Sequence, residues 1–171
     1  GISLVTHMAN PFVPTVHMNL RFMHTSKVWF GGGADLTPTF PFDEDTADFH
    51  AALKAAADGY RPGAYDEYKA WCDKYFYLPH RQEPRGVGGI FVDDLNSGDL
   101  EKDFAFLRSI GAAFLDIYPK IVARRKDMPF TEADRETSRE LREHIKEKVK
   151  QAGLWAPHLP EEYGGAGLDF L

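Results

Sequence analysis

The stretch VHMNLRF, residues 16–22, alternates strictly between apolar and polar side chains. A β-strand sends successive side chains to opposite faces, so the alternation predicts one apolar and one polar face. The apolar face would pack inward and would carry Val16, Met18, Leu20 and Phe22. The polar face would carry His17, Asn19 and Arg21. An imidazole, an amide and a guanidinium would therefore stand in a row on the same strand.

The polar row has two explanations, the solvated face of an edge strand or the wall of a binding site. Two neighbours favour a binding site. Ser3 and His7 fall on one side of the preceding alternating stretch GISLVTH, and Asp35 follows the triple glycine at 31–33. Arginine, histidine, amide, hydroxyl and carboxylate groups together suit an anionic ligand that also carries N–H donors.

Other patterns along the chain predict a mixed fold. Short strands are expected at 28–30 and 89–95, and the glycines at 31–33 indicate a bulge or a close backbone approach. Helices are expected at 43–58 with Asp43 as N-cap and Gly59 as stop, at 64–78, after the cap Asp99, and at 131–153 behind the capping box TEAD. We therefore predict an α+β fold, an antiparallel β-sheet flanked by helices with an appended helical tail.

Composition limits the classes of function. With 171 residues and 43% hydrophobic side chains the chain has the size of one ordinary globular domain. The net charge of -6 argues against nucleic acid or an anionic membrane as a partner. No apolar run reaches the roughly 20 residues of a membrane span. Cys72 is the single cysteine, which excludes an internal disulfide. We expect a soluble cytoplasmic protein.

Further charged residues have competing interpretations. The stretch HRQEPRG, 80–86, is either a solvated loop or a carboxylate-binding loop that uses Arg81 or Arg85. In VDDL, Asp93 and Asp94 could form an acid pair, but alternation points one of them to solvent. Histidines 7, 17, 50 and 80 could hold a metal, although their spacing is long and irregular. His50 lies on a helix beside an apolar stripe, which favours a hydrogen-bonded structural histidine.

Four longer stretches occur in order and at a characteristic spacing: NPFVPTVHMNLRF, WFGGGADLTP, KAWCDKYFYLPHR and RGVGGIFVDDL. On these motifs, residues 1 to about 130 resemble the central part of oxygen-dependent coproporphyrinogen III oxidases. The resemblance implies oxidative decarboxylation of coproporphyrinogen III, a small-molecule tetrapyrrole, to protoporphyrinogen IX in haem biosynthesis. It implies molecular oxygen as co-substrate, no organic cofactor, and a homodimer for the intact enzyme. It also implies that this chain carries an incomplete version of the parent fold.

The resemblance assigns roles to individual residues. His17 matches the proton donor, and Asp35 would accept hydrogen bonds from pyrrole N–H groups, so both are expected to be catalytic. The substrate-binding residues would be Ser3, Asn19, Arg21 and Arg85, the last as a second clamp on propionates. His7, His17, His50 and His80 match histidines described as ligands of a divalent metal in some bacterial members. That metal set conflicts with His17 as an acid, since one imidazole cannot easily serve as both.

The C-terminal part departs from this family. Residues 134–171 resemble the N-terminal helical segment of acyl-CoA dehydrogenases, most clearly in GLWAPHLPEEYGGAGL. We therefore expect two parts, 1–133 and 134–171, joined as a chimera, and we expect the chain to be an inactive fragment of the oxidase. Two alternative functions remain. A non-catalytic tetrapyrrole- or anion-binding module would bind without turnover, and an acyl-CoA dehydrogenase relative would retain FAD on purification.

Overall fold

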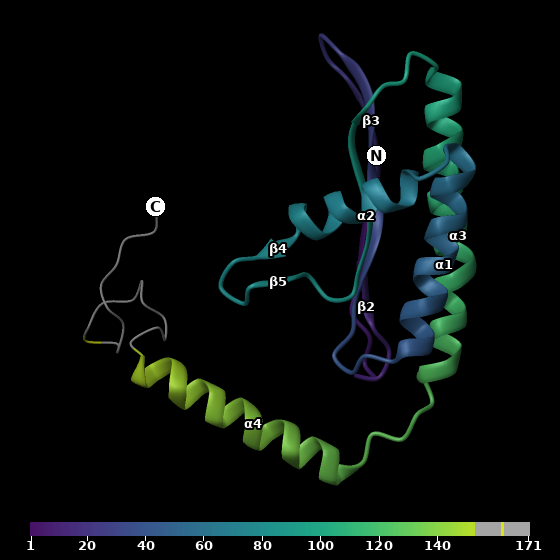
Figure 1. Ribbon diagram of the computed structural model, residues 1–171. Coiled ribbons are helices and arrows are strands. Elements are labelled where there is room, and N and C mark those ends of the chain that lie inside the picture. Colours follow the sequence, from purple (N-terminus) through teal and green to yellow (C-terminus); the bar gives the residue numbers. More distant parts are fainter. Residues whose placement is uncertain (153–161, 163–171) are drawn as a thin grey trace. The chain divides into compact units, whose positions relative to one another are not determined.

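A computed structural model describes residues 1–152 and residue 162 of the chain (Figure 1). The chain divides into two compact units, Gly1–Met128 and Pro129–Leu171. Among the described residues, no helix has both the length and the apolar character that crossing a bilayer requires.

A four-stranded antiparallel sheet forms the centre of the first unit. Its strands are β1 (Ile2–Thr6), β2 (Thr15–His24), β3 (Val28–Thr37) and β6 (Gly88–Leu95), in the spatial order β1-β2-β3-β6. The alternation in β2 has the predicted effect: Val16 and Met18 are buried, and the polar residues lie on the other face. Phe22 is the exception, with half of its surface exposed near the end of the strand. The predicted α+β fold is confirmed.

Strand β3 is longer than the three residues predicted, because the triple glycine lies inside it. A Cβ atom on Gly32 would lie 2.0 Å from the Asn19 carbonyl oxygen, and one on Gly33 would lie 1.9 Å from that of Ile90. The pairing register with β6 also shifts between Phe30 and Gly32. The glycines therefore provide both the bulge and the close backbone approach that the sequence indicated, without ending the strand.

Helices α1 (Asp43–Tyr60) and α3 (Leu100–Arg125) lie side by side on the apolar face of the sheet (Figure 1). Their buried residues complete a continuous core with the strands: Phe49, Leu53 and Ala57 from α1, and Phe106, Ile110, Phe114 and Ile121 from α3. The predicted cap of α3 is confirmed, since the Asp99 side chain accepts a hydrogen bond from the Lys102 amide.

Both predicted ends of α1 are wrong by one or two residues. Phe42 is the N-cap and makes no side-chain hydrogen bond, whereas Asp43 lies in the first turn, where its charge favours the helix dipole. The helix passes Gly59 and ends at Tyr60. Tyr60 is held there because its ring stacks on Phe106 at 4.5 Å and its hydroxyl donates to buried Asp103 at 2.7 Å. Tertiary contacts thus extend the helix beyond its local stop signal.

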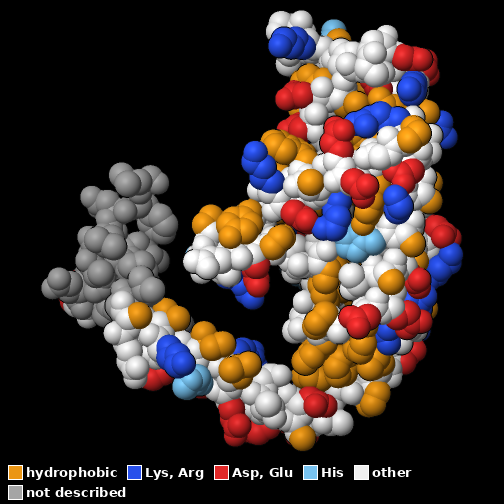
Figure 2. All heavy atoms as spheres, in the orientation of Figure 1, with side chains coloured by type: hydrophobic (Ala, Val, Ile, Leu, Met, Phe, Trp, Pro, Cys, Tyr) orange, Lys and Arg blue, Asp and Glu red, His pale blue; other side chains and the backbone are white. Residues whose placement is uncertain are grey.

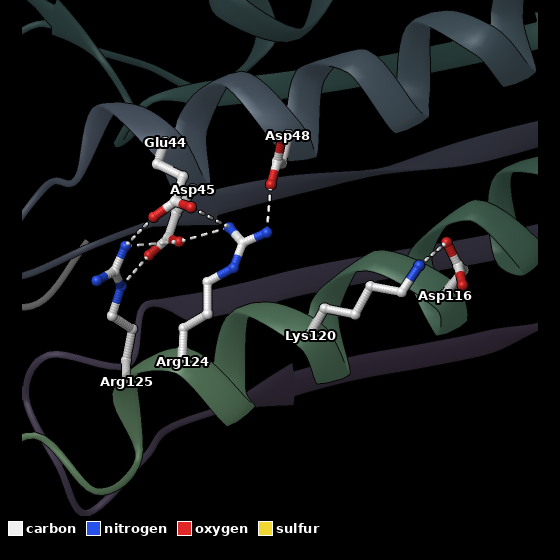
Figure 3. Close-up of polar contacts among 7 residues, drawn as sticks. All are labelled: Glu44, Asp45, Asp48, Asp116, Lys120, Arg124 and Arg125. Carbon is white, nitrogen blue, oxygen red and sulfur yellow. Dashed lines mark hydrogen bonds and ion pairs between the residues drawn. The ribbon is translucent and has the colours of Figure 1, made fainter.

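Ion pairs join the start of α1 to the end of α3 (Figure 3). The Asp45 side chain is only 4% exposed and accepts hydrogen bonds from Arg125, at 2.7 and 3.0 Å, and from Arg124, at 3.2 Å. Arg125 also lies over the Phe42 ring at 4.0 Å. On the face of the molecule in Figure 2, acidic and basic side chains are interspersed over these helices. A buried carboxylate therefore links the two ends, together with charged side chains that are more exposed than Asp45.

Helix α2 (Ala64–Tyr75) packs against β6 and leads into a hairpin of two short strands, β4 (Tyr77–Leu78) and β5 (Glu83–Pro84). The sequence predicted α2 to reach residue 78, but Tyr77 and Leu78 pair with β5 instead. The hairpin extends to the side of the sheet away from α1 and α3 (Figure 1). It therefore reaches the side on which the polar face of β2 lies.

In the second unit, helix α4 (Glu132–Gln151) begins with the predicted capping box. The Thr131 hydroxyl accepts from the Asp134 amide, and the Asp134 side chain accepts from the Thr131 amide. None of its residues is buried, and its apolar residues Leu141 and Ile145 are 57% and 49% exposed. The predicted stop at Gly153 and the stretch GLWAPHLPEEYGGAGL fall almost wholly outside the described residues.

Candidate active site

Strand pairing brings the polar residues of three strands onto one face of the sheet. His17 lies opposite Asp35, and Asn19 lies between Ser3 on β1 and Gly33 on β3. Directly opposed residues in an antiparallel pair point to the same face, so all four side chains share it. Arg21 lies opposite Gly31, whose missing side chain leaves room for the guanidinium: a Cβ there would be 3.0 Å from Arg21 Nε.

A cavity of about 210 Å³ opens on this face. Every residue assigned to catalysis or substrate binding from the sequence lines it: Ser3, His17, Asn19, Arg21, Asp35 and Arg85. Aromatic residues from the end of α2 and from β6 complete the wall, namely Tyr75, Phe76 and Phe91. The juxtaposition predicted from alternation and motif order is therefore present in the fold.

Asp35 is the most buried charged group of the site, with its side chain 4% exposed. Arg85 binds it through two hydrogen bonds, Nε to Oδ2 at 2.8 Å and a terminal nitrogen to Oδ1 at 2.6 Å. His17 Nδ1 lies 3.5 Å from Oδ2. Burial lowers the pKa of His17, and the charges of Arg85 and His7 lower it further, while Asp35 raises it. The site thus combines an ion pair with an imidazole whose neutral form is favoured by burial.

Arg21 is held by β6 and by aromatic rings. A terminal nitrogen donates to Asp93 Oδ1 at 2.9 Å, and the guanidinium lies 5.4 Å from the Trp29 ring centroid and 5.5 Å from that of Phe91. Asp94, in contrast, is exposed, as alternation predicted for one member of the pair. These contacts fix the guanidinium in the wall of the cavity with further N–H donors to spare.

Unpartnered polar atoms concentrate in this cavity. In the described part of the chain, four buried side-chain nitrogen or oxygen atoms lack a hydrogen-bond partner: His17 Nδ1, Asn19 Oδ1, Arg21 Nε and Thr37 Oγ1. The first three belong to the polar row of β2. A buried polar group without a partner costs about 1–3 kcal/mol, so these three atoms mark the polar row as a place where a ligand or water would supply partners.

Comparison with known proteins shows the family of the sequence. A sequence profile described as coproporphyrinogen III oxidase matches residues 1–145. The chain belongs to the coproporphyrinogen III oxidase family. It is 54% identical over 136 residues to the oxygen-dependent coproporphyrinogen-III oxidase of Rickettsia bellii, covering 80% of this chain and 49% of that protein. The same-named proteins of Rickettsia akari and Rickettsia africae are 53% and 52% identical over the same length and shares.

The chain spans about half the length of the curated coproporphyrinogen oxidases that it matches. The family match reaches residue 145, within α4 and beyond the boundary at 133/134 expected from the sequence. The division into 1–133 and 134–171 therefore stays a prediction. The same holds for the acyl-CoA dehydrogenase resemblance, which depends mainly on residues outside the described range.

The histidines proposed as metal ligands do not fit a metal site. Among residues 1–152 and 162, no group of three or more His, Cys, Asp or Glu side chains is arranged to hold an ion. His50 Nε2 contacts the Val87 carbonyl at 2.9 Å, and its Nδ1 contacts the Tyr65 hydroxyl at 2.8 Å. Both ring nitrogens are engaged, as expected for a structural histidine. His80 is exposed on the β4–β5 hairpin.

The structural role of His50 predicts a pH-dependent stability. Burial lowers the pKa of His50, and this outweighs the hydrogen bond to Val87 that raises it. The unfolded chain therefore binds this proton more readily, and the contribution of His50 is present above about pH 6.5 and decreases as the pH falls below it. We expect the destabilisation caused by His50→Gln to be smaller at about pH 5 than at about pH 7.5. Urea unfolding of both proteins measures this difference, and a pH-independent difference would contradict it.

Sequence reasoning missed the three aromatic residues of the cavity wall. Phe91 could have been found, because alternation in GIFVDDL places it on the face that carries Gly89. Phe76 and Tyr75 gave no such signal. They lie at the end of α2 and reach the cavity only because the chain turns there into the β4–β5 hairpin.

Proposed function

We propose that the cavity is part of the substrate site of an oxygen-dependent coproporphyrinogen III oxidase. The observation that carries the proposal is the row of unpartnered atoms on His17, Asn19 and Arg21. Coproporphyrinogen III offers both kinds of partner that these atoms lack, since its propionates accept hydrogen bonds and its pyrrole N–H groups donate them. The names of the family's curated members support the same ligand.

The proposed reaction converts two propionate side chains to vinyl groups. In each case the carboxylate leaves as carbon dioxide, a hydrogen leaves the neighbouring carbon, and the released electron pair reduces molecular oxygen to hydrogen peroxide with uptake of a proton. The electron-rich pyrrole supplies the reactivity. The protein's task is to orient the ring and to place charges around it.

Each polar residue has a distinct proposed part in that task. Arg21 binds a propionate, because its side chain lines the cavity and its guanidinium keeps N–H donors beyond the terminal nitrogen that holds Asp93. Asp35 accepts from pyrrole N–H groups, since a carboxylate retains acceptor sites beyond the two that Arg85 occupies. Asn19 and Ser3 bind at the edge of the ring, and His17 is the proton donor.

The size of the cavity suggests how much of the ligand this chain holds. About 210 Å³ lies below the roughly 300–1,000 Å³ typical of ligand pockets. It accommodates one pyrrole with its side chains rather than a whole tetrapyrrole. We therefore expect the 171-residue chain to bind tetrapyrrole weakly and to turn it over at a trace rate at most.

Binding of coproporphyrinogen III under nitrogen, followed by quenching of intrinsic fluorescence, tests the proposal. Arg21→Ala should weaken binding roughly tenfold or more, because it removes a charge-assisted contact to a propionate. Lys120→Ala is the matched control. It removes one positive charge from an exposed ion pair with Asp116 and should leave the dissociation constant unchanged.

Equal binding by the wild-type chain, the Arg21→Ala variant and the control would contradict a propionate site at Arg21. A parallel assay under air, read by protoporphyrin fluorescence, tests turnover separately. Substantial turnover would contradict the expectation of an inactive half-site and would leave the assignment of the ligand intact.

A further inference from the structure

The Arg85 guanidinium and the His17 imidazole both lie near one oxygen of Asp35, Oδ2. Arg85 Nε donates to Oδ2 at 2.8 Å, and His17 Nδ1 lies 3.5 Å from the same atom without forming a hydrogen bond. The second oxygen, Oδ1, accepts from Arg85 at 2.6 Å. Histidine beside a buried carboxylate would ordinarily close onto it, since a charge-assisted hydrogen bond is stronger than a neutral one. Here Arg85 donates to both carboxylate oxygens instead.

Arg85 is fixed in this position from several directions. Its guanidinium carbon lies 3.8 Å from the Phe76 ring centroid, and its backbone amide donates to the Phe76 carbonyl at 3.1 Å. The next residue, Gly86, has a φ of 58°, and a Cβ there would lie 2.3 Å from the Leu36 carbonyl oxygen. Val87 then donates to that same carbonyl at 3.0 Å. A segment held this tightly keeps the guanidinium on Asp35 even before a ligand binds.

We propose that Arg85 is a positioning residue that occupies both oxygens of Asp35, holds this carboxylate off the His17 imidazole, and so keeps Nδ1 as an acceptor without a hydrogen bond. This role differs from the direct propionate clamp that the sequence suggested. It does not depend on the identity of the ligand, because the competition for Oδ2 exists in the ligand-free chain. Among the described residues, the charges that act on His17 are those of Asp35, Arg85 and His7.

The state of the His17 ring provides a direct measurement. We would label the full chain with ¹⁵N-histidine, assign His17 by its loss in His17→Gln, and record long-range ¹H–¹⁵N spectra at mildly alkaline pH without ligand. In the wild type, Nδ1 should show the shift of an unprotonated ring nitrogen. In Arg85→Met, Asp35 loses its partner, and the ratio of the Nδ1–H to the Nε2–H tautomer should rise roughly tenfold as Nδ1–H donates to Oδ2.

Matched variants separate this role from general support of the fold. Arg81→Met removes the other arginine of the hairpin, which pairs with Glu83 at the surface, and should leave the His17 spectrum unchanged. Arg85→Lys should give an intermediate ratio, because lysine offers a point charge rather than a fork. If Arg85→Met does not fold, Phe76→Leu serves instead, since it removes only the stacking contact and should raise the ratio in part.

A folded Arg85→Met or Phe76→Leu protein with the wild-type tautomer ratio would overturn the inference, as would a wild type already protonated at Nδ1. A lower melting temperature with an unchanged tautomer ratio of His17 would indicate that Arg85 and Asp35 form a structural ion pair only, and would also overturn the inference. Because no tetrapyrrole is present, these results stand apart from the binding assay. Failure of the chain to bind coproporphyrinogen would refute the proposed function without altering the tautomer result.

Discussion

Replacing Gly33 with alanine is expected to lower the free energy of unfolding by roughly 3 kcal/mol or more, at the upper end for overpacked positions. The added Cβ would lie 1.9 Å from the Ile90 carbonyl oxygen. Strand β3 is hydrogen-bonded on both sides, to β2 and to β6, so neither neighbour can move away without breaking its pairing. Urea unfolding followed by circular dichroism measures the effect.

Gly59→Ala is the control for this substitution. Gly59 lies in α1, a Cβ there would meet nothing within 4 Å, and its backbone is helical. Alanine should therefore stabilise the chain by about 0.4–1 kcal/mol. Stability changes of opposite sign at the two glycines would establish that the close backbone approach at Gly33 makes a side chain there destabilising. A Gly33→Ala protein as stable as the wild type would show that β3 can shift.

Replacing Asp45 with alanine is expected to cost about 3 kcal/mol of unfolding free energy, because it leaves two arginines without their buried partner. Figure 3 shows Asp45 between Arg124 and Arg125, which retain only the more exposed Glu44 and Asp48. The loss should appear as earlier unfolding in urea with an unchanged slope.

The same figure contains the matched comparison. Asp116 and Lys120 form an exposed pair one turn apart on α3, with side chains 67% and 58% exposed. Asp116→Ala should therefore change stability by only about 0.3–0.5 kcal/mol. Equal effects of the two substitutions would mean that the burial of Asp45 contributes little to the strength of its contacts.

The regions around Gly33, Asp45 and His50, where substitutions are predicted above, support the site in different ways. The glycines of β3 keep its backbone close to β2, which places Asp35 opposite His17. The ion pairs of Asp45 hold α1 against α3, and these helices support the apolar face of the same sheet. His50 holds the carbonyl of Val87, next to the segment that carries Arg85. Stability and the geometry of the cavity therefore depend on the same contacts.

Much of the fold could be predicted from local patterns. The alternation of β2, the caps at Asp99 and Thr131 and the exposure of Asp94 all follow from properties of a few adjacent residues. The end of α1 beyond Gly59 could not, because Tyr60 makes contacts with residues of α3 that no local signal encodes.

The sequence by itself determined which side chains stand on the polar face of β2, since strand geometry alone alternates them. It also supplied the candidates for the site, partly from the residue types themselves and partly from the resemblance to the oxidase family. Only the tertiary structure decided their partners: Arg85 rather than His17 on Asp35, and Asp93 on Arg21. The physical reason is that these pairs join residues 50 and 72 positions apart, so their geometry depends on how strands and hairpin pack rather than on any local preference.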